Sequence, residues 1–571
     1  MRSILIALVS ALSWWDPAAI RPQQRGVCIT EWEGGQRREI PVVVMGTLDA
    51  TSPGRQAVLV RLADEAFTGM GVVAGMSGSP VYIDGKLLGA VAFGWSFAHD
   101  PLAGVTPFAQ MREISGEGAA PAAPQPTLAQ MAGVISGAVE PAAVLPALSA
   151  GARRGPLQVA VGGLPLPSGF GADVLGRAEL SGVPAGTVAI PAGVPEAGEM
   201  IAALLVWGDA TLAAGGTVTA RDGDRIWAFG HPFFSLGAVR IPAARARVIA
   251  VQSSYQSSFK VFGVGPSFGA FVADRPAGML AEVGPSPEGL PVVVTVKDAT
   301  GDATWSFHLA RVPMLEPLLA TFLINACLTA RGASNGEATV RLRLAVELAD
   351  GASVAVEQST RGVDALARVA TFVGAAVAYL ESSSFPHPEI TALRAELERR
   401  ESAIGATLGE AIPDRTTVRP GETVAVTVLL QPDRGQPERH RLSLTVPRDQ
   451  PAGKVDLVVA DGAAWSEYRL HAEGLVPASF RDEVDQLRML ESASTLVAAL
   501  EAKDPGLARP GVSQPALPPS WSATLTSGLG VRGVKRLSTA TIDTTRWQAP
   551  YPLVGAFRIP LTVLPQPLEA Q

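Results

Sequence analysis

Short runs of alternating apolar and polar residues, separated by glycine and proline turns, constrain this chain more than any other feature of its sequence. Such runs occur at residues 41–46 and 57–61, and again at 200–207, 216–220 and 291–296. A period of two places one face of an extended strand in a core and the other in solvent. With Gly 59 and Pro 46 among 571 residues and only 17% charged residues, the composition favours many strands joined by turns. The chain is therefore predicted to be mainly β.

Composition also indicates how the strands are grouped into folding units. The segments that we expect are a signal peptide (1–16), a first β unit (17–115), a Pro/Ala-rich linker with a Gly/Pro-rich stretch (116–199), a second β unit (200–312), a helical connecting region that braces the β units (313–385), a β-sandwich-like accessory domain (386–475) and a C-terminal segment (476–571). Residues 388–402 fit either a charged helix or an exposed strand.

The first residues have the order of charge and hydropathy that is typical of an export signal. Arg2 precedes an apolar run from Ile4 to Trp15, which is too short to cross a bilayer comfortably. A buried N-terminal helix is the alternative. No later apolar stretch reaches about 18 uncharged residues, so no integral membrane span is expected. These features predict a secreted, periplasmic or cell-envelope protein.

Several classes of partner and cofactor are disfavoured by composition. The formal net charge is −7, and no Lys/Arg-dense stretch is present, so nucleic acid is not expected as a partner. Cys28 and Cys327 are the only cysteines, which is too few for a zinc ribbon, and whether they pair is left open. The six histidines show no metal-ligand spacing. No metal site and no cofactor are predicted.

The stretch most informative about function reads GMSGSP at residues 75–80 and leads into a hairpin with an Asp84-Gly85 turn. An α/β-hydrolase elbow would need Gly at position 79 and a following helix, and neither is found. A loop of small residues before a hairpin instead matches the nucleophile loop of chymotrypsin-like proteases. Ser77 would be the nucleophile, and the backbone N–H groups of Gly75 and Ser77 would form the oxyanion hole.

The longer stretch around this loop resembles the SpoIVB peptidase family. The similarity runs from residue 57 to 111 and includes GMSGSP, a GAV strand and an Asp-Pro before a glycine. It implies a chymotrypsin-like double β-barrel, a protein or peptide substrate and a serine protease mechanism. In the family an acidic residue lies upstream of the serine, and the resemblance carries this role to Asp64.

The resemblance also selects the general base. His231 ends a strand-turn-strand segment (216–231) that is similar to the histidine segment of the family, and the similarity continues through Ser258-Phe-Lys260 and the DRPAGM motif that starts at Asp274. In the family the histidine segment comes before the serine segment, whereas here Ser77 comes first. Because a triad is defined by geometry and not by chain order, we expect a circularly permuted core. His99 is the alternative base, and a purely structural role is the alternative for His231.

The sequence thus predicts a serine endopeptidase of SpoIVB type that acts on exported or envelope proteins. Ser77 would attack the scissile carbonyl, His231 would take and return the proton, and Asp64 would orient the imidazole. The alternative from another class is a non-catalytic envelope scaffold that keeps a protease-like fold. Oligomeric state cannot be predicted from these features.

Overall fold

The computed structural model describes residues 13–52, 55–95, 97–98, 100–118, 121–145, 157–164, 178–182, 189–255, 257–332, 336–473, 477–503, 506–509, 512–514, 520, 524, 535–537 and 539–565. The chain folds into two compact units. Unit 1 comprises residues 1–122, 146–290 and 306–319, and unit 2 comprises residues 123–145, 291–305 and 320–571.

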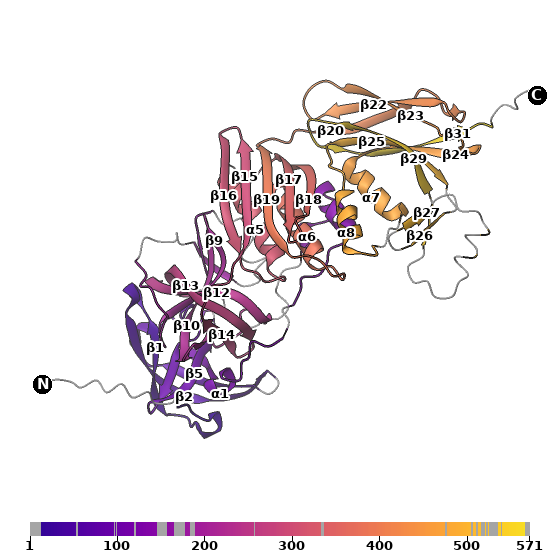
Figure 1. Cartoon of the computed structure of the whole chain (residues 1–571). Coiled ribbons are helices and arrows are strands. Elements are labelled where there is room, and N and C mark those ends of the chain that lie inside the picture. The colour runs from indigo at the N-terminus through magenta and orange to yellow at the C-terminus, as the bar shows by residue number, and fades with distance from the viewer. Residues whose placement is uncertain are drawn as a thin grey trace, which may run out of the picture. The chain divides into compact units, whose positions relative to one another are not determined.

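The first barrel of unit 1 is closed by six strands in the order β1-β2-β3-β6-β5-β4. Strands β1, β2 and β5 of this barrel are labelled in Figure 1. These strands are β1 (Arg25–Glu31), β2 (Arg37–Ser52), β3 (Arg55–Leu62), β4 (Pro80–Ile83), β5 (Lys86–Phe93) and β6 (Leu102–Pro107). The alternation that predicts strands also fills the interior, where Val42, Val58 and Val60 are buried. Short helices flank the barrel: η1 (Pro17–Ala19), η2 (Glu33–Gly35), η3 (Glu65–Phe67) and α1 (Phe108–Met111).

A second ring of six strands lies in the same unit. Its strands are β9 (Met200–Gly208), β10 (Thr211–Asp222), β11 (Arg225–Ala228), β12 (Gly237–Gln252), β13 (Phe259–Arg275) and β14 (Gly278–Val283). They pair in the order β9-β12-β13-β14-β11-β10, and the pairing of β9 with β10 closes the ring. Two further strands, β7 (Leu157–Gly162) and β8 (Ala178–Gly182), extend from β10. Unit 1 therefore contains two β-barrels, and the prediction of a mainly β protein with a β-barrel protease core is confirmed.

Unit 2 contains a sheet with strands in the order β18-β17-β19-β15. The strands are β15 (Leu290–Asp298), β17 (Ala338–Leu348), β18 (Ser353–Gly362) and β19 (Ile390–Arg400), and β16 (Gly301–Leu309) pairs with β15. Helix α6 (Ala365–Glu381) packs on β17 and β18. Helix α5 (Glu316–Ala330) and this helix occupy the region where helices were expected between the β units. Two shorter helices, α2 (Leu128–Ser136) and α3 (Pro141–Val144), pack against α6.

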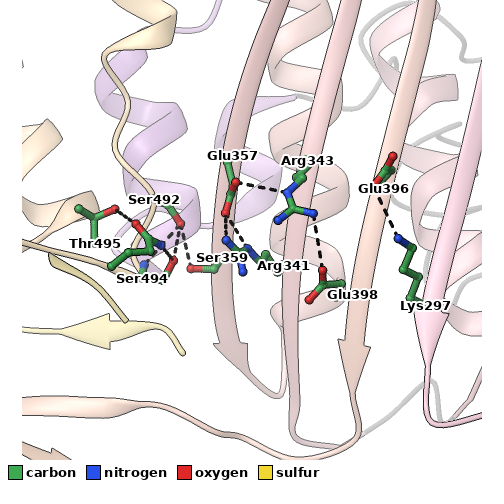
Figure 2. A network of polar contacts seen from close by, with 11 residues as sticks. Lys297, Arg341, Arg343, Glu357, Ser359, Glu396, Glu398, Ser492, Ser494 and Thr495 are labelled. Atoms are coloured by element: carbon green, nitrogen blue, oxygen red, sulfur yellow. Dashed lines mark hydrogen bonds and ion pairs between the residues drawn. The ribbon is translucent and has the colours of Figure 1, made fainter. Parts of the chain in front are cut away.

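Strand β19 settles the two readings of residues 388–402. It pairs in parallel with β15 and antiparallel with β17, and Leu393 and Leu397 on one face are buried. The charged residues of its other face form cross-strand ion pairs, among them Lys297–Glu396 at 3.8 Å and Arg343–Glu398 at 3.8 Å (Figure 2). Alternation with a period of two therefore determines the structure here.

The rest of unit 2 is a β-sandwich. One sheet has the order β23-β22-β20-β30 and the other β21-β31-β24-β25-β29. Their strands are β20 (Ala406–Pro413), β21 (Thr417–Val418), β22 (Thr423–Pro432), β23 (Glu438–Thr445), β24 (Gly453–Asp461), β25 (Thr495–Lys503), β29 (Thr539–Gln548), β30 (Leu553–Val554) and β31 (Ala556–Val563). Because strands after residue 475 complete both sheets, the sandwich extends beyond the expected range 386–475.

Two helices and a small sheet complete unit 2. Helix α7 (Gly462–Glu473) covers the outer face of β24 and β25, where Trp465 is buried, and α8 (Phe480–Arg488) packs on β18. The small sheet consists of β26 (Leu507–Arg509), β27 (Val512–Gln514) and β28 (Lys535–Arg536). Among the helices formed by the described residues, none has the length and apolar character needed to cross a membrane.

Two sequence questions concern the N-terminal region and the cysteines. Most of the expected signal peptide lies outside the described residues, and export stays a prediction. Trp15, at the end of the apolar run, donates a hydrogen bond from Nε1 to the Ile83 carbonyl at 2.8 Å. Cys28 and Cys327 are both buried, and neither forms a disulfide.

Candidate active site

The loop of residues 75–80 lies just before β4 and has a backbone shape that demands glycine. Gly75 and Gly78 have φ values of 93° and 96°, in the left-handed region that side chains disfavour. A Cβ atom on Gly78 would lie 1.9 Å from the Thr217 carbonyl oxygen. The GxSG spacing in the sequence therefore has a steric cause, because the second barrel approaches this loop too closely for any side chain at position 78.

The loop is fixed by hydrogen bonds from β10 of the second barrel. The Thr217 N–H donates to the Ser77 carbonyl at 2.7 Å, and its hydroxyl donates to the Gly75 carbonyl at 2.9 Å. The Thr219 hydroxyl donates to the Gly78 carbonyl at 2.8 Å. Thr217 and Thr219 are buried, so these bonds are protected from water. The conformation of the Ser77 loop thus depends on both barrels.

His231 lies directly beside Ser77. It follows β11 on a tight turn in which Phe229 and Gly230 both have φ 67°, and its Nε2 lies 2.9 Å from Ser77 Oγ. Its Nδ1 lies 2.8 Å from the Pro232 carbonyl oxygen. A carbonyl can only accept, so in the neutral imidazole Nδ1 carries the proton and Nε2 is free to accept from the Ser77 hydroxyl. Burial lowers the pKa of His231 and favours this neutral form.

Asp64, the expected third member, is engaged elsewhere. It caps η3, where its Oδ1 accepts from the Ala66 N–H at 3.0 Å, and its Oδ2 pairs with Arg38 at 2.6 Å. Partial desolvation raises its pKa, but the hydrogen bonds from Ala66 and Arg38 outweigh this effect and leave the pKa lowered. The structure brings Ser77 and His231 together and does not bring Asp64 to the imidazole. His99, the alternative base, lies outside the described residues.

Asp274 is the carboxylate that supports the histidine loop. It is fully buried near the end of β13, and it accepts N–H bonds from Phe233 at 2.7 Å, Phe234 at 2.7 Å and Leu236 at 3.0 Å. Burial raises the pKa of Asp274, and the backbone donors offset part of that rise. These bonds fix the chain immediately after His231. The sequence signal was present in the DRPAGM motif, but no role for Asp274 could be inferred from it.

Two backbone donors at the Ser77 loop are free for a ligand. The neighbouring amides are used: Met76 N–H donates to the Val73 carbonyl at 3.0 Å and Gly78 N–H to the Val91 carbonyl at 2.7 Å. The N–H groups of Gly75 and Ser77 donate to no described residue. This pair is the one expected to form the oxyanion hole.

Lys260 packs against the Ser77 loop. Its side chain is fully buried, and its methylene carbons are the atoms that a Cβ on Gly75 would meet at 3.0 to 3.3 Å. Its Nζ donates to Thr30 Oγ1 at 2.7 Å, and Thr30 Oγ1 also accepts from Ser79 Oγ at 2.8 Å. Burial lowers the pKa of Lys260 to about 7, against an opposing effect of Glu31. Lys260 is therefore a second residue that supports the serine loop. It lies in the segment 258–260 that resembles the family, but the sequence assigned it no role.

The two barrels with a serine and a histidine in hydrogen-bond contact define a candidate hydrolase site. The comparisons agree with this class. The family model described as SpoIVB peptidase S55 matches residues 21–111, which confirms the resemblance over the region of the serine loop and supports a peptidase. Neither the comparison with curated proteins nor that with solved structures gave a match. No cluster of potential metal ligands occurs among the described residues.

Proposed function

We propose that the protein is a serine endopeptidase in which Ser77 and His231 work as a dyad. The observation that carries the proposal is the 2.9 Å contact between Ser77 Oγ and His231 Nε2, with Nδ1 directed to the Pro232 carbonyl. This is the hydrogen-bond geometry that a general base needs for a hydroxyl nucleophile. The Pro232 carbonyl takes the orienting role that was expected of Asp64.

The proposed reaction proceeds through an acyl-enzyme. Ser77 Oγ bonds to the scissile carbonyl carbon while its proton moves to His231 Nε2, and the carbonyl oxygen becomes an oxyanion facing the N–H groups of Gly75 and Ser77. When the C–N bond breaks, His231 returns the proton to the leaving amine. Water then attacks the acyl group with His231 again as base, which releases the acid and restores the serine.

Labelling with a fluorophosphonate probe tests this proposal. We expect stoichiometric modification of wild-type protein at Ser77, with none in Ser77→Ala and a loss of about 10³-fold or more in labelling rate in His231→Ala. Ser79→Ala is the matched control, because that hydroxyl belongs to the same loop but bonds to Thr30. It should keep its label. If folded wild-type protein is not labelled, the dyad is refuted and a scaffold role is favoured.

We also propose that the protein acts outside the cytoplasm, on exported or envelope proteins. The apolar run from Ile4 to Trp15 after Arg2 supports this location. Expression with the native N-terminus, followed by fractionation and N-terminal sequencing, should find the protein exported. A wholly cytosolic protein with an intact Met1 would contradict the prediction.

A further inference from the structure

A groove opens beside Ser77 in unit 1. It is partly open to solvent, and Ser77 is one of its lining residues. One wall is formed by residues 69–74 and a second wall by residues 91–95, the first three of which belong to β5. The N–H of Gly78 and the carbonyl of Ser79 both bond to Val91, so this second wall is tied directly to the serine loop.

The groove is lined by uncharged residues, and much of its lining is small. None of the described residues that line it is Asp, Glu, Lys, Arg or His. Gly69, Gly71 and Gly94 contribute no side chain, and Ala74 and Ala92 contribute only a methyl group. A charged side chain entering this groove would lose hydration and find no counter-charge on the described lining residues, which is unfavourable. An apolar side chain would lose little and gain contact.

The rim of the groove carries exposed aromatic side chains. Trp95, Phe97 and Tyr255 line it and are 49%, 74% and 99% exposed. They are the most exposed aromatic hydrophobics in the part of the chain that the structure describes. Phe97 also holds φ 58°, a conformation that costs energy for a non-glycine residue. Clustered exposed aromatics are typical of a binding surface, so the rim favours an apolar ligand.

The position of His231 determines which part of a peptide the groove receives. The leaving amine must lie beside His231, because this imidazole gives it a proton. Ser77 lines the groove, whereas His231 does not. The groove therefore lies on the acyl side of the scissile bond.

We propose that this groove binds the side chain of the residue whose carbonyl is attacked, and that it selects an uncharged apolar side chain such as Leu or Phe over Lys or Glu. The proposal rests on the proposed peptidase function. Burial of a side chain of this size corresponds to a preference of roughly 10- to 100-fold.

Diphenyl aminophosphonates test the inference on the full-length protein, because their side chain sits next to the phosphorus that Ser77 attacks. We would measure second-order rates of Ser77 modification by intact mass for leucine, phenylalanine, lysine and glutamate analogues, with a simple fluorophosphonate in parallel. We expect the leucine and phenylalanine analogues to react about 10- to 100-fold faster than the charged ones. Equal rates, or faster reaction of a charged analogue, would overturn the proposed selectivity. In that case, labelling of Ser77 by the simple fluorophosphonate would still support the peptidase proposal. Absence of any label on Ser77 would refute both.

A charge placed in the groove provides an independent test. Val72 lines the groove and is half-buried, and Val72→Asn is an uncharged match for Val72→Asp in size and polarity. For each variant we would take the ratio of the lysine-analogue rate to the leucine-analogue rate. This ratio should be about 10-fold or more higher in Val72→Asp than in Val72→Asn. If the two variants, each shown to be folded by circular dichroism, have the same lysine-to-leucine ratio, the groove does not contact that side chain.

Discussion

Replacement of Asp274 by Asn tests how the protein positions His231, the proposed general base. The carboxylate accepts three N–H bonds, one on Oδ1 and two on Oδ2. An amide has only one oxygen, so Asn must lose at least one bond to a charged acceptor and point an N–H₂ group at a backbone donor. The lost bond corresponds to about 1.5–3 kcal/mol, and the unsatisfied buried donor adds about 1–3 kcal/mol. We expect Asp274→Asn to lower the stability of unit 1 by about 3–5 kcal/mol.

The effect should reach the chemistry through His231. Loss of one or more of the bonds from Phe233, Phe234 and Leu236 loosens the chain that follows His231, and a displacement of about 1 Å corresponds to a rate loss of about 10²-fold. The assay is the fluorophosphonate labelling rate at a temperature well below the melting transition of the variant.

Asp461 supplies a matched control in unit 2. It is also buried, and it accepts N–H bonds from Ala463 at 3.0 Å, Ala464 at 3.0 Å and Gly555 at 2.9 Å. Asp461→Asn should cost similar stability and leave the labelling rate of Ser77 within about 2-fold, because it breaks the same kind of bonds in the other unit. If folded Asp274→Asn labels as fast as wild type, or if Asp461→Asn slows labelling equally, Asp274 does not position the base.

Further predictions follow from the same geometry. Because burial lowers the pKa of His231, the labelling rate should fall on acidification with a midpoint below 6.5, and a midpoint above 6.5 would contradict a buried neutral base. Gly78→Ala should greatly slow labelling and destabilise unit 1, since its Cβ would overlap Thr217. The control is Gly85→Ala, with φ 73° and open space around its Cβ, which should lower the free energy of unfolding by only about 1–2 kcal/mol in chemical denaturation. The pKa of Lys260 is about 7 in the folded protein and 10.5 in the unfolded chain, so between these pH values the unfolded chain binds one more proton than the folded protein. The free energy of unfolding should therefore rise with pH in this range, by up to about 1.4 kcal/mol per pH unit. Lys260→Met should flatten that rise in denaturant titrations at pH 7 to 10, and an unchanged slope would show that Lys260 does not titrate there.

The sequence predicted those parts of the site that depend on local backbone chemistry. The loop at 75–80 could be recognised because its glycines are required by φ and by close packing. His231 was selected on a resemblance of residues 216–231 to the family, a segment outside the residues 21–111 that the family model matches. The orienting group could not be inferred, because the proximity of the Pro232 carbonyl to Nδ1 depends on the rotamer of His231 and on the path of the following loop. Asp64 is near Ser77 in sequence, but its capping role and Arg38 direct it to other partners.

The fold shows the same limit at a larger scale. The strands follow from alternation, which is a local property, whereas the two barrels were expected from the family resemblance. The extent of the sandwich does not, because Gly453–Asp461 pairs with Thr495–Lys503 and Ala556–Val563 across long separations. Strand β19 likewise could not be told from a helix until its parallel partner was known, since Ile390, Leu393 and Leu397 fit a helical period while Leu393, Ala395 and Leu397 fit a period of two.

The separation of Ser77 from His231 by 154 residues has a consequence for biosynthesis. At about 5–20 residues per second, a ribosome needs about 8–30 seconds to extend the chain from Ser77 to His231. For most of that interval the ribosome has not yet reached Thr217 and Thr219, whose hydrogen bonds hold the Ser77 loop in shape. A nascent chain therefore emerges with Ser77 in a loop whose supporting hydrogen bonds are not yet formed. On the proposed function, neither the chain itself nor its neighbours on the export route can be cut until the second barrel has folded onto the first.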